Sequence, residues 1–299
     1  MNVLIIGGAG FIGKHLTNNF HNQKNCKVYT VDLQFSKDFI GNGNYIGDIK
    51  DSKFFKKCIR ETKPDLVYYL VSFFSFNNIE NSKYSFKNSL ICLQNLFKNL
   101  VSRQRLVFIG SSAQYGKIPS NLQPVTENSG FYPVSSYGIF KIFEEYEIRR
   151  LAKKHNIDVI GARVFNVTGP GEPNRMVGGS IISQLKNNNK IKIGNLMSKR
   201  DFLDVRDVAN ALVFIGKKGK SNEIYNVCSG KSISIKNYLE LIVKELRIKP
   251  IISIDQNRVD PYDIKDLVGD NTKIIKELDW HIEYDISKSI KDIANDINF

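Results

Sequence analysis

Cysteine is scarce in this chain of 299 residues, and its cysteines lie far apart. None belongs to a Cys-x-x-Cys pair or has the histidine spacing of a zinc site, so the sequence predicts no bound metal. The same scatter offers no disulfide framework and suits a reducing, cytoplasmic environment. The four positions are Cys26, Cys58, Cys92 and Cys228.

Long hydrophobic runs are also lacking. The longest apolar stretch, residues 66–76, contains serines and is too short to cross a bilayer as a helix. We interpret it as a buried strand and the loop that follows. The N-terminal apolar run, residues 3–6, stops at a glycine and gives no targeting signal. We therefore expect no membrane partner.

Acidic residues are outnumbered, with 30 Asp and Glu against 43 Lys and Arg and a formal net charge of +13. Basic blocks are nonetheless absent, because the excess is spread over single residues and short pairs such as Lys56-Lys57. This scatter favours a solvated, lysine-rich surface, and the alternative is attraction of an anion such as a phosphorylated small molecule. We expect no nucleic-acid partner.

Short β-branched strands alternate with amphipathic helices through the first half of the chain. Such alternation predicts βαβ units and a Rossmann-type, doubly wound parallel sheet of the α/β class. Strands are expected at residues 3–6, 27–31, 65–71, 105–109 and 158–164, and helices at residues 11–20, 83–100 and 137–154.

The regularity weakens after Pro170, where shorter elements follow one another. We expect helices near residues 181–186, 205–215 and 235–246, and strands near 190–193 and 223–227. We interpret this part as a smaller α/β region that completes the site over the sheet. The proposed boundary divides residues 1–165 from residues 166–299, with exchange of chain between the two allowed for.

A glycine-rich turn joins the first strand to the first helix. Gly7, Gly10 and Gly13 permit a tight turn, let backbone N–H groups approach a pyrophosphate and allow close packing of helix and strand. Phe11 and Ile12 complete this motif. Asp32 ends the next strand, where a carboxylate accepts hydrogen bonds from an adenosine ribose and repels a 2′-phosphate. The pattern predicts NAD(H) rather than NADP(H) as cofactor.

Asp48 and Ile49 precede the next expected helix and are candidate contacts of the adenine. A helix N-cap role for Asp48 or Asp51 explains the same residues equally well.

Tyr137 and Lys141 are four residues apart, on one face of an expected helix. A phenol has an ordinary pKa near 10, and a neighbouring ammonium favours its ionised form, which brings proton transfer closer to neutral pH. Ser111 and Ser112 follow the strand before this helix, at the carboxyl end, where a hydroxyl can hydrogen-bond a carbonyl.

Together these motifs make the chain resemble an extended short-chain dehydrogenase/reductase, the group of nucleotide-sugar epimerases, dehydratases and 4-ketoreductases. The resemblance implies that residues 1–165 bind NAD(H) and residues 166–299 a nucleotide-diphosphate sugar. It runs through residues 7–13, Asp32, 48–49, 111–116, Tyr137 with Lys141, 163–166, 169–171, 194–196, 200–207, 225–227 and 269–270.

The resemblance also implies roles for single residues. Tyr137 is the acid/base, Lys141 holds the nicotinamide ribose and tunes the tyrosine, and Ser111 orients the sugar, with Ser112 as the fallback. Leu70 and Val71 are expected near the nicotinamide, although this strand reads Tyr69-Leu70-Val71-Ser72 where relatives usually have His-Leu-Ala-Ala.

The chain differs from many relatives at two places, one that bears on the type of reaction and one that bears on the substrate. Sugar 4,6-dehydratases carry an Asp-Glu pair where this chain has Ser112 and Ala113, so dehydration is not expected, and the pattern is nearest to the GDP-4-keto-6-deoxymannose reductases. Asp260 stands where many relatives have the arginine that grips the substrate diphosphate. The expected substrate contacts are Asn166, Arg200 and Arg258.

We predict a 4-ketoreductase that acts in polysaccharide biosynthesis. The alternatives are a 4-epimerase with tightly held NAD and a non-catalytic NAD-binding regulatory protein. We also expect a homodimer joined by a four-helix bundle, because the helices at residues 83–100 and 137–154 carry more apolar residues than one buried face requires. The alternative is that the C-terminal region covers this surplus.

Overall fold

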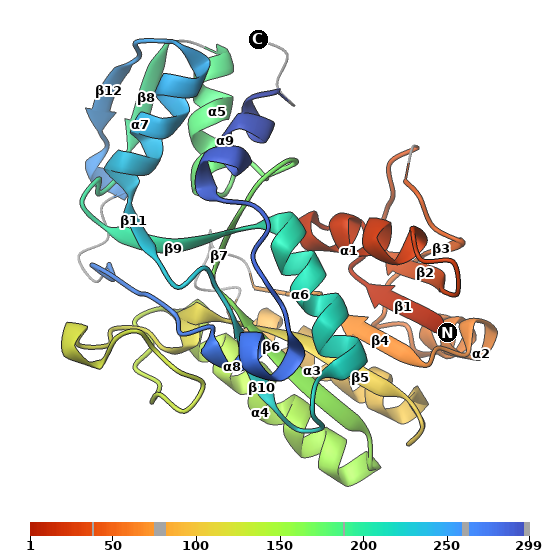
Figure 1. The fold of residues 1–299 in the computed structure, drawn as a ribbon. Coiled ribbons are helices and arrows are strands. Elements are labelled where there is room, and N and C mark those ends of the chain that lie inside the picture. The colour runs from red at the N-terminus through yellow and green to blue at the C-terminus, as the bar shows by residue number, and fades with distance from the viewer. Residues whose placement is uncertain (38, 75–81, 188, 259–262, 296–299) are drawn as a thin grey trace.

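Seven parallel strands form the central sheet, in the order β10-β6-β5-β4-β1-β2-β3 (Figure 1). The computed structural model describes all residues except 38, 75–81, 188, 259–262 and 296–299. The strand order confirms the predicted doubly wound α/β class. The strands are β1 (Asn2–Ile6), β2 (Lys27–Asp32), β3 (Gly43–Ile46), β4 (Leu66–Tyr69), β5 (Arg105–Ser111), β6 (Asp158–Val164) and β10 (Ile224–Val227).

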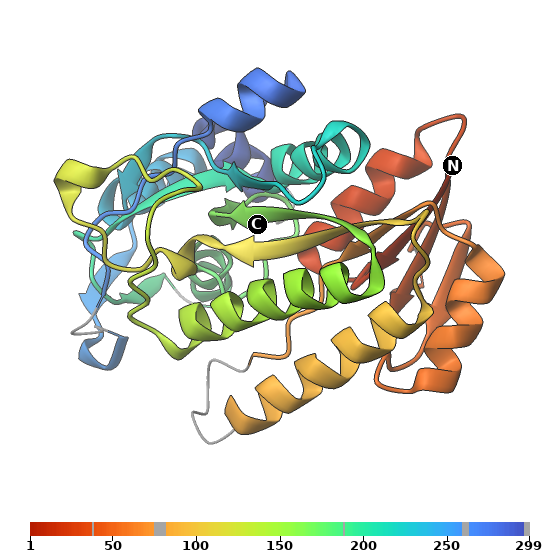
Figure 2. The same ribbon diagram turned by 90° about the horizontal axis from the view of Figure 1, so that it is seen from below.

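Helices cover both faces of this sheet (Figure 2). α1 (Phe11–His21) and α6 (Val205–Lys218) pack on one face, and α2 (Ser52–Thr62), α3 (Ser82–Asn99) and α4 (Ser136–His155) pack on the other. Alternate side chains of β1 serve the two cores: Val3 and Ile5 face α1 and α6, whereas Leu4 and Ile6 face α2 and α3. Burial on both faces explains why the central strands β1 and β4 are almost continuously apolar in sequence.

A smaller lobe lies at the upper left of Figure 1. We call it the C-terminal lobe. It consists of α5 (Val177–Asn187), β8 (Lys190–Ile193), α7 (Ile235–Leu246), β12 (Ile251–Ile254) and α9 (Ile286–Asn295). Its own apolar core includes Ile181, Leu239 and Ile290. Between the lobe and the sheet runs a three-stranded sheet of β11 (Ser232–Ser234), β9 (Lys199–Asp204) and β7 (Asn166–Thr168).

The chain crosses between the two parts more than once. α6 and β10 follow residue 165 in sequence but belong to the layers of the large sheet, and α8 (Thr272–Leu278) packs beside β10. β3, β7, β9, β11, β12, α8 and α9 were not anticipated. The apolar stretch 66–76 supplies β4, which is shorter than the expected strand, and its last two residues lie outside the described part of the chain.

None of the helices in the described residues is long and apolar enough to span a membrane.

Candidate active site

The candidate cofactor and catalytic residues lie along the carboxyl edge of the large sheet, in which β1 and β4 are neighbours. From this pair the chain winds outward in both directions, through β2 and β3 on one side and β5 and β6 on the other. Such a switch point is where open α/β sheets bind ligands. Gly7 follows β1, Asp32 ends β2, Leu70 and Val71 follow β4, Ser111 ends β5, and Asn166 begins β7 just after β6.

The glycine turn after β1 requires glycine at positions 7 and 13. Gly7 has φ +89° and donates its N–H to the Val31 carbonyl at 2.8 Å. A Cβ on Gly13 would lie 2.2 Å from the Gly7 carbonyl oxygen, so helix and turn are in direct backbone contact. Gly10 is the N-cap of α1 and supplies no side-chain cap, and Phe11 and Ile12 form its first turn. The N–H groups of that turn therefore suit a pyrophosphate.

Asp32 fastens this turn to β2. One carboxylate oxygen accepts the Ala9 N–H at 2.9 Å, and the other accepts the Leu33 N–H at 2.8 Å. Each carboxylate oxygen has a second lone pair that can accept from a ribose hydroxyl. Leu70 and Val71 lie against the same turn, since a Cβ on Gly7 would be 3.3 Å from Leu70 and 3.4 Å from Val71.

Asp48 and Ile49 have local structural partners. Asp48 accepts the Lys50 N–H at 2.8 Å and pairs with the Lys50 ammonium at 3.3 Å. Ile49 is buried in the core beside α2 and α3. Of the two aspartates considered as caps, Asp51 is the N-cap of α2, because its side chain accepts the N–H groups of Lys53 and Phe54.

Tyr137 and Lys141 lie one turn apart in the first part of α4, as predicted. The ring of Tyr137 is 5.3 Å from that of Phe74, centre to centre. Lys141 is buried, and its ammonium donates to the Ile109 carbonyl at 2.9 Å and to a carboxylate oxygen of Glu144 at 2.8 Å. An ammonium has three N–H groups, so a third remains for another acceptor.

Ser111 caps a short 3-10 helix of residues Ser112–Gln114. Its hydroxyl oxygen accepts the Ala113 N–H at 3.2 Å, which leaves the hydroxyl proton available for donation. Ser112 is buried. A Cβ on Gly138 would lie 2.4 Å from the Ala113 carbonyl oxygen, so the start of α4 rests on this turn and brings Tyr137 close to it.

A buried polar network fixes the same turn, and it was not anticipated. Gln114 accepts the Ser111 N–H at 2.7 Å and donates to Glu145 at 2.8 Å. Arg163 forms two hydrogen bonds to Glu145, at 2.7 and 3.1 Å, and donates to the Tyr115 hydroxyl at 3.0 Å. The sequence does contain a signal for this network. Arg163 lies inside the apolar strand 158–164, and a buried guanidinium requires a buried acid as its partner.

The expected substrate residues lie in different surroundings. Asn166 donates to the Asp201 carbonyl at 3.3 Å on the adjacent strand β9. Arg200 is already engaged by Asp263 and by the Ile264 carbonyl, so its charge is compensated within the chain. Arg258, in a short 3-10 helix beside β8, pairs with Asp255 at 3.4 Å. Asp260 lies outside the described residues.

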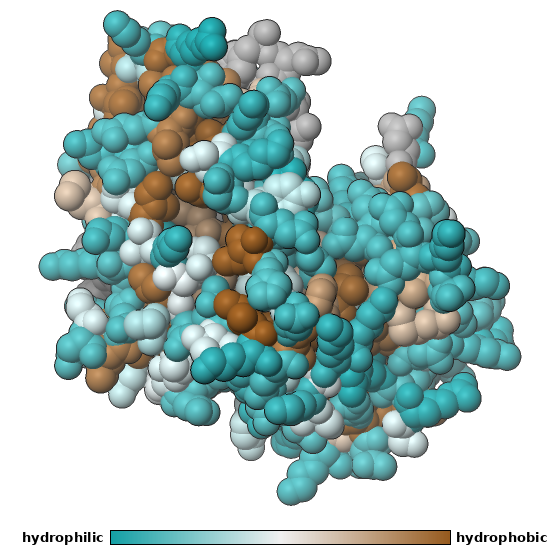
Figure 3. Space-filling view, in the orientation of Figure 1, coloured by the Kyte–Doolittle hydropathy of each residue, from teal (hydrophilic) through white to brown (hydrophobic). Residues whose placement is uncertain are grey.

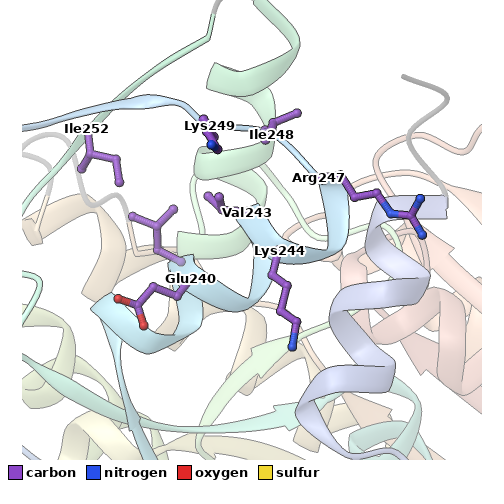
Figure 4. A pocket seen from close by; sticks show the side chains of 8 residues that line it. Glu240, Val243, Lys244, Arg247, Ile248, Lys249 and Ile252 are labelled. Carbon is purple, nitrogen blue, oxygen red and sulfur yellow. The ribbon is translucent and has the colours of Figure 1, made fainter.

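A hollow in the C-terminal lobe is lined by α7 and the segment leading into β12 (Figure 4). Its sides include Val243, Ile248 and Ile252, with Lys244 and Arg247 at its rim. Apolar side chains gather on this part of the surface (Figure 3). The hollow contains none of the candidate residues and lies away from the carboxyl edge of the large sheet. We therefore place the candidate site at that edge.

The cysteines are free thiols, and no cluster of His, Cys, Asp and Glu in the described residues is arranged to hold a metal ion.

Known nucleotide-sugar enzymes resemble the chain in sequence and in structure. A GDP-6-deoxy-D-mannose reductase of Pseudomonas aeruginosa is 27% identical over 196 residues, a match that covers 64% of this chain and 64% of the relative. The structure of a UDP-glucose 4-epimerase with UDP-glucose from Thermotoga maritima superposes with a TM-score of 0.87 at 22% identity, covering 99% of this chain and 98% of that one. The structure of RMD from Pseudomonas aeruginosa complexed with NADPH has a TM-score of 0.85 at 23% identity, with the same coverage.

The sequence model of the family described as GDP-mannose 4,6 dehydratase matches residues 4–293. That match includes the glycine turn, the tyrosine and lysine of α4 and most of the C-terminal lobe. The chain therefore belongs to this family of NAD-dependent nucleotide-sugar enzymes, within the extended short-chain dehydrogenases/reductases.

Proposed function

We propose that the protein is an NAD(H)-dependent nucleotide-sugar 4-ketoreductase, which reduces the C4 carbonyl of an NDP-4-keto-(6-deoxy)sugar. The observation that carries this proposal is the common location of three groups. Tyr137 and Lys141 lie one turn apart on α4, and α4 begins against the turn of Ser111, at the sheet edge that also bears the glycine turn. The reductase among the relatives supports the direction of reaction.

The residues present fit NAD(H), which supplies a hydride when bound. The backbone of the glycine turn would hold the pyrophosphate, with Gly7, Gly10 and Gly13 keeping side chains out of the way. Asp32 would accept from the adenosine ribose. Leu70 and Val71, which lie against the turn, would support the nicotinamide side, and Asp48 and Ile49 would flank the adenine.

The chemistry at the sugar would then use three side chains. Tyr137 donates its phenolic proton to the C4 oxygen as the carbonyl is reduced. Lys141 directs its remaining N–H toward the cofactor ribose and favours release of that proton by its charge. Ser111 donates its hydroxyl proton to the same sugar oxygen. Ser112, which is buried, is the alternative residue for this role.

We propose that residues 1–165, together with α6 and β10, bind the cofactor, and that the rest of residues 166–299 binds the nucleotide sugar. Asn166 is best placed for the sugar because it begins β7 at the sheet edge. Both arginines have an acidic partner, but Arg258 is the stronger candidate for the diphosphate, because its side chain is 49% exposed against 22% for Arg200. The free thiols favour a cytoplasmic location, and the substrate class favours polysaccharide biosynthesis.

Dehydration is not proposed despite the family's name. Eliminating water needs an added acid and base beside the serine, and Ser112 and Ala113 supply neither. The second candidate is a 4-epimerase, favoured by the likeness to the UDP-glucose 4-epimerase structure. A non-catalytic NAD-binding protein would not need both Tyr137 and Lys141.

The ultraviolet spectrum of the purified protein separates the two activities. A reductase should bind NADH exchangeably and consume it in proportion to the 4-keto sugar nucleotide added. An epimerase should retain stoichiometric NAD that is unchanged after many turnovers. Retained, unconsumed NAD would overturn the reductase assignment.

We propose that the functional unit is a homodimer joined through α3 and α4. Part of the apolar surplus of these helices is used within the chain, because Phe86 packs against Phe140 and Phe143 at ring distances of 5.2 and 5.0 Å. Ile139 and Tyr146 of α4 are still 53% and 65% exposed. Both helices lie side by side on the face of the sheet opposite α1 and α6 (Figure 2).

A further inference from the structure

A buried carboxylate faces the lysine of the proposed catalytic pair. Glu144 follows Lys141 by three residues on α4, and the side chains of the two are only 4% and 5% exposed. One carboxylate oxygen accepts from the Lys141 ammonium at 2.8 Å, and the other accepts from the Ser89 hydroxyl at 2.7 Å. The carboxylate is therefore held between α3 and α4, in contact with the ammonium.

The other groups around Lys141 and Glu144 are neutral or already paired, so Glu144 is the counter-charge of the Lys141 ammonium. Burial raises the pKa of Tyr69 well above its ordinary value and that of Cys92 to about 12, so both are neutral near pH 7. Glu145 is paired with Arg163. The described groups that face Lys141 and Glu144 are Tyr69 from β4, Ser89 and Cys92 from α3, the Ile109 carbonyl from β5, and Tyr137 and Glu145 from α4.

A buried ammonium without a counter-charge gives up its proton readily, because a dry environment disfavours charge. Burial lowers the pKa of Lys141, but Glu144, Tyr137 and Glu145 raise it, and the net shift is upward. Glu144 is the largest of the influences that raise the pKa of Lys141, since it contributes both a charge and a hydrogen bond.

We propose that Glu144 is a positioning residue that keeps Lys141 charged and sets where its ammonium points. Two of the three N–H groups of the ammonium are fixed by Glu144 and the Ile109 carbonyl, so the third has a defined direction. This inference rests on the proposed function, in which that third N–H serves the cofactor ribose and the charge serves Tyr137.

Removing the charge of Glu144 leaves the buried ammonium without its nearest counter-charge, so Lys141 gives up its proton at lower pH. Reduction needs the charged ammonium beside Tyr137. The alkaline end of the pH profile of reduction therefore moves to lower pH.

Glu144→Gln tests the proposal, because glutamine keeps the shape and loses the charge. We expect the alkaline limb of kcat/KM to move down by about one to three pH units. NADH affinity, followed by the fluorescence of NADH, should fall over that same range in the variant and stay level in the unaltered protein. Glu144→Asp, which keeps the charge, should restore much of both. If Glu144→Gln leaves both the alkaline limb of kcat/KM and the NADH affinity unchanged, the proposal is wrong.

Two further variants serve as a control and as a substitute test. Glu147→Gln removes a charge from the same helix, but Glu147 pairs with Arg150 at 2.8 Å, so neither readout should move. An equal shift in Glu147→Gln would contradict a specific role for Glu144. If Glu144→Gln does not fold, Ser89→Ala takes its place as the test, because the Ser89 hydroxyl donates to the Glu144 carboxylate. Losing that hydrogen bond should give a smaller shift in the same direction, and no shift would refute the proposal.

The experiments distinguish a failure of the proposed function from a failure of the inference about Glu144. If the unaltered protein reduces no 4-keto sugar nucleotide, the reductase assignment fails, and the pH dependence of NADH affinity still tests Glu144. If reduction occurs and Glu144→Gln leaves both readouts unchanged, only the inference about Glu144 fails.

Discussion

At the scale of single residues, candidate site residues often have a structural partner as well as the proposed ligand. Asp32 closes the glycine turn through the Ala9 N–H, and Lys141 is anchored by Glu144 and the Ile109 carbonyl. Such contacts fix the direction of a side chain before any ligand arrives, which lowers the entropy lost on binding. They also mean that a substitution there alters the site's shape as well as its chemistry.

Asp32 should give a preference for NADH over NADPH, because its carboxylate repels a 2′-phosphate. Asp32→Asn keeps the shape of the side chain and one acceptor oxygen, and it removes the charge. We expect its ratio of kcat/KM for NADPH over NADH to rise by about tenfold or more, which corresponds to about 1.4 kcal/mol. Side-by-side kinetics with both cofactors measure this ratio. A preference of the unaltered protein for NADPH would show that a nearby cation such as Lys37 outweighs the carboxylate.

At the scale of elements, α6 links the large sheet to the C-terminal lobe. Asp204 is its N-cap and accepts the Arg206 N–H at 2.8 Å. The guanidinium of Arg206 pairs with Asp204 at 2.8 Å and with Asp292 of α9 at 2.6 Å, and the Ser289 hydroxyl donates to Asp204 at 2.6 Å. One buried carboxylate thus holds the start of α6 and the docking of α9 together.

Asp204→Ala should therefore destabilise the protein more than the loss of an ordinary cap. We expect its free energy of unfolding to fall by about 3 kcal/mol, because a cap is lost and Arg206 loses a buried partner. Asp51→Ala removes the exposed N-cap of α2 and should cost about 1 kcal/mol. Denaturant unfolding compares the two. Equal losses would contradict the linking role of Asp204.

Sequence patterns predicted the elements whose periodicity is strong. The first two strands and the helices α1, α3 and α4 appear within two residues of their expected bounds. β3, with alternate residues exposed, and the short strands β7, β9 and β11 gave too little apolar pattern, whereas β8 was predicted with its observed bounds. The placement of α6 and β10 in the large sheet depends on long-range pairing, such as Ile224 with Gly161, which no local window contains.

The same limit applies to the candidate site. Its members at strand ends, such as Asp32 and Ser111, could be proposed from their positions alone. Glu144 and Arg163 could not, because their partners come from other elements. Likewise, sequence alone gave no sign that Arg200 is compensated by Asp263, 63 residues away.

At the scale of the whole molecule, we propose a cofactor site at one edge of the sheet, a C-terminal lobe that binds the substrate and a dimer formed through α3 and α4. Ile139 and Tyr146 are large, exposed and on the helix that carries Tyr137. A shared interface on this helix would hold α4 in place in both copies of the chain.

Light scattering at micromolar concentration should report about twice the 34.1 kDa mass of the chain. Ile139→Glu should shift the protein toward the monomer, because it places a charge in the proposed interface. Ile252→Glu, at a site 45% exposed on the C-terminal lobe, should leave the mass unchanged. A monomeric unaltered protein would defeat the dimer, and dissociation by Ile252→Glu instead would refute its geometry.

We propose that Tyr137 delivers the proton in NADH-dependent reduction of a nucleotide sugar at C4. Its most direct test is turnover of a 4-keto sugar nucleotide by Tyr137→Phe, with NADH affinity measured on the same preparation. We expect turnover to fall by about a hundred- to ten-thousand-fold, because a positioned acid is lost, while NADH affinity changes little. Near-normal turnover by Tyr137→Phe would contradict it.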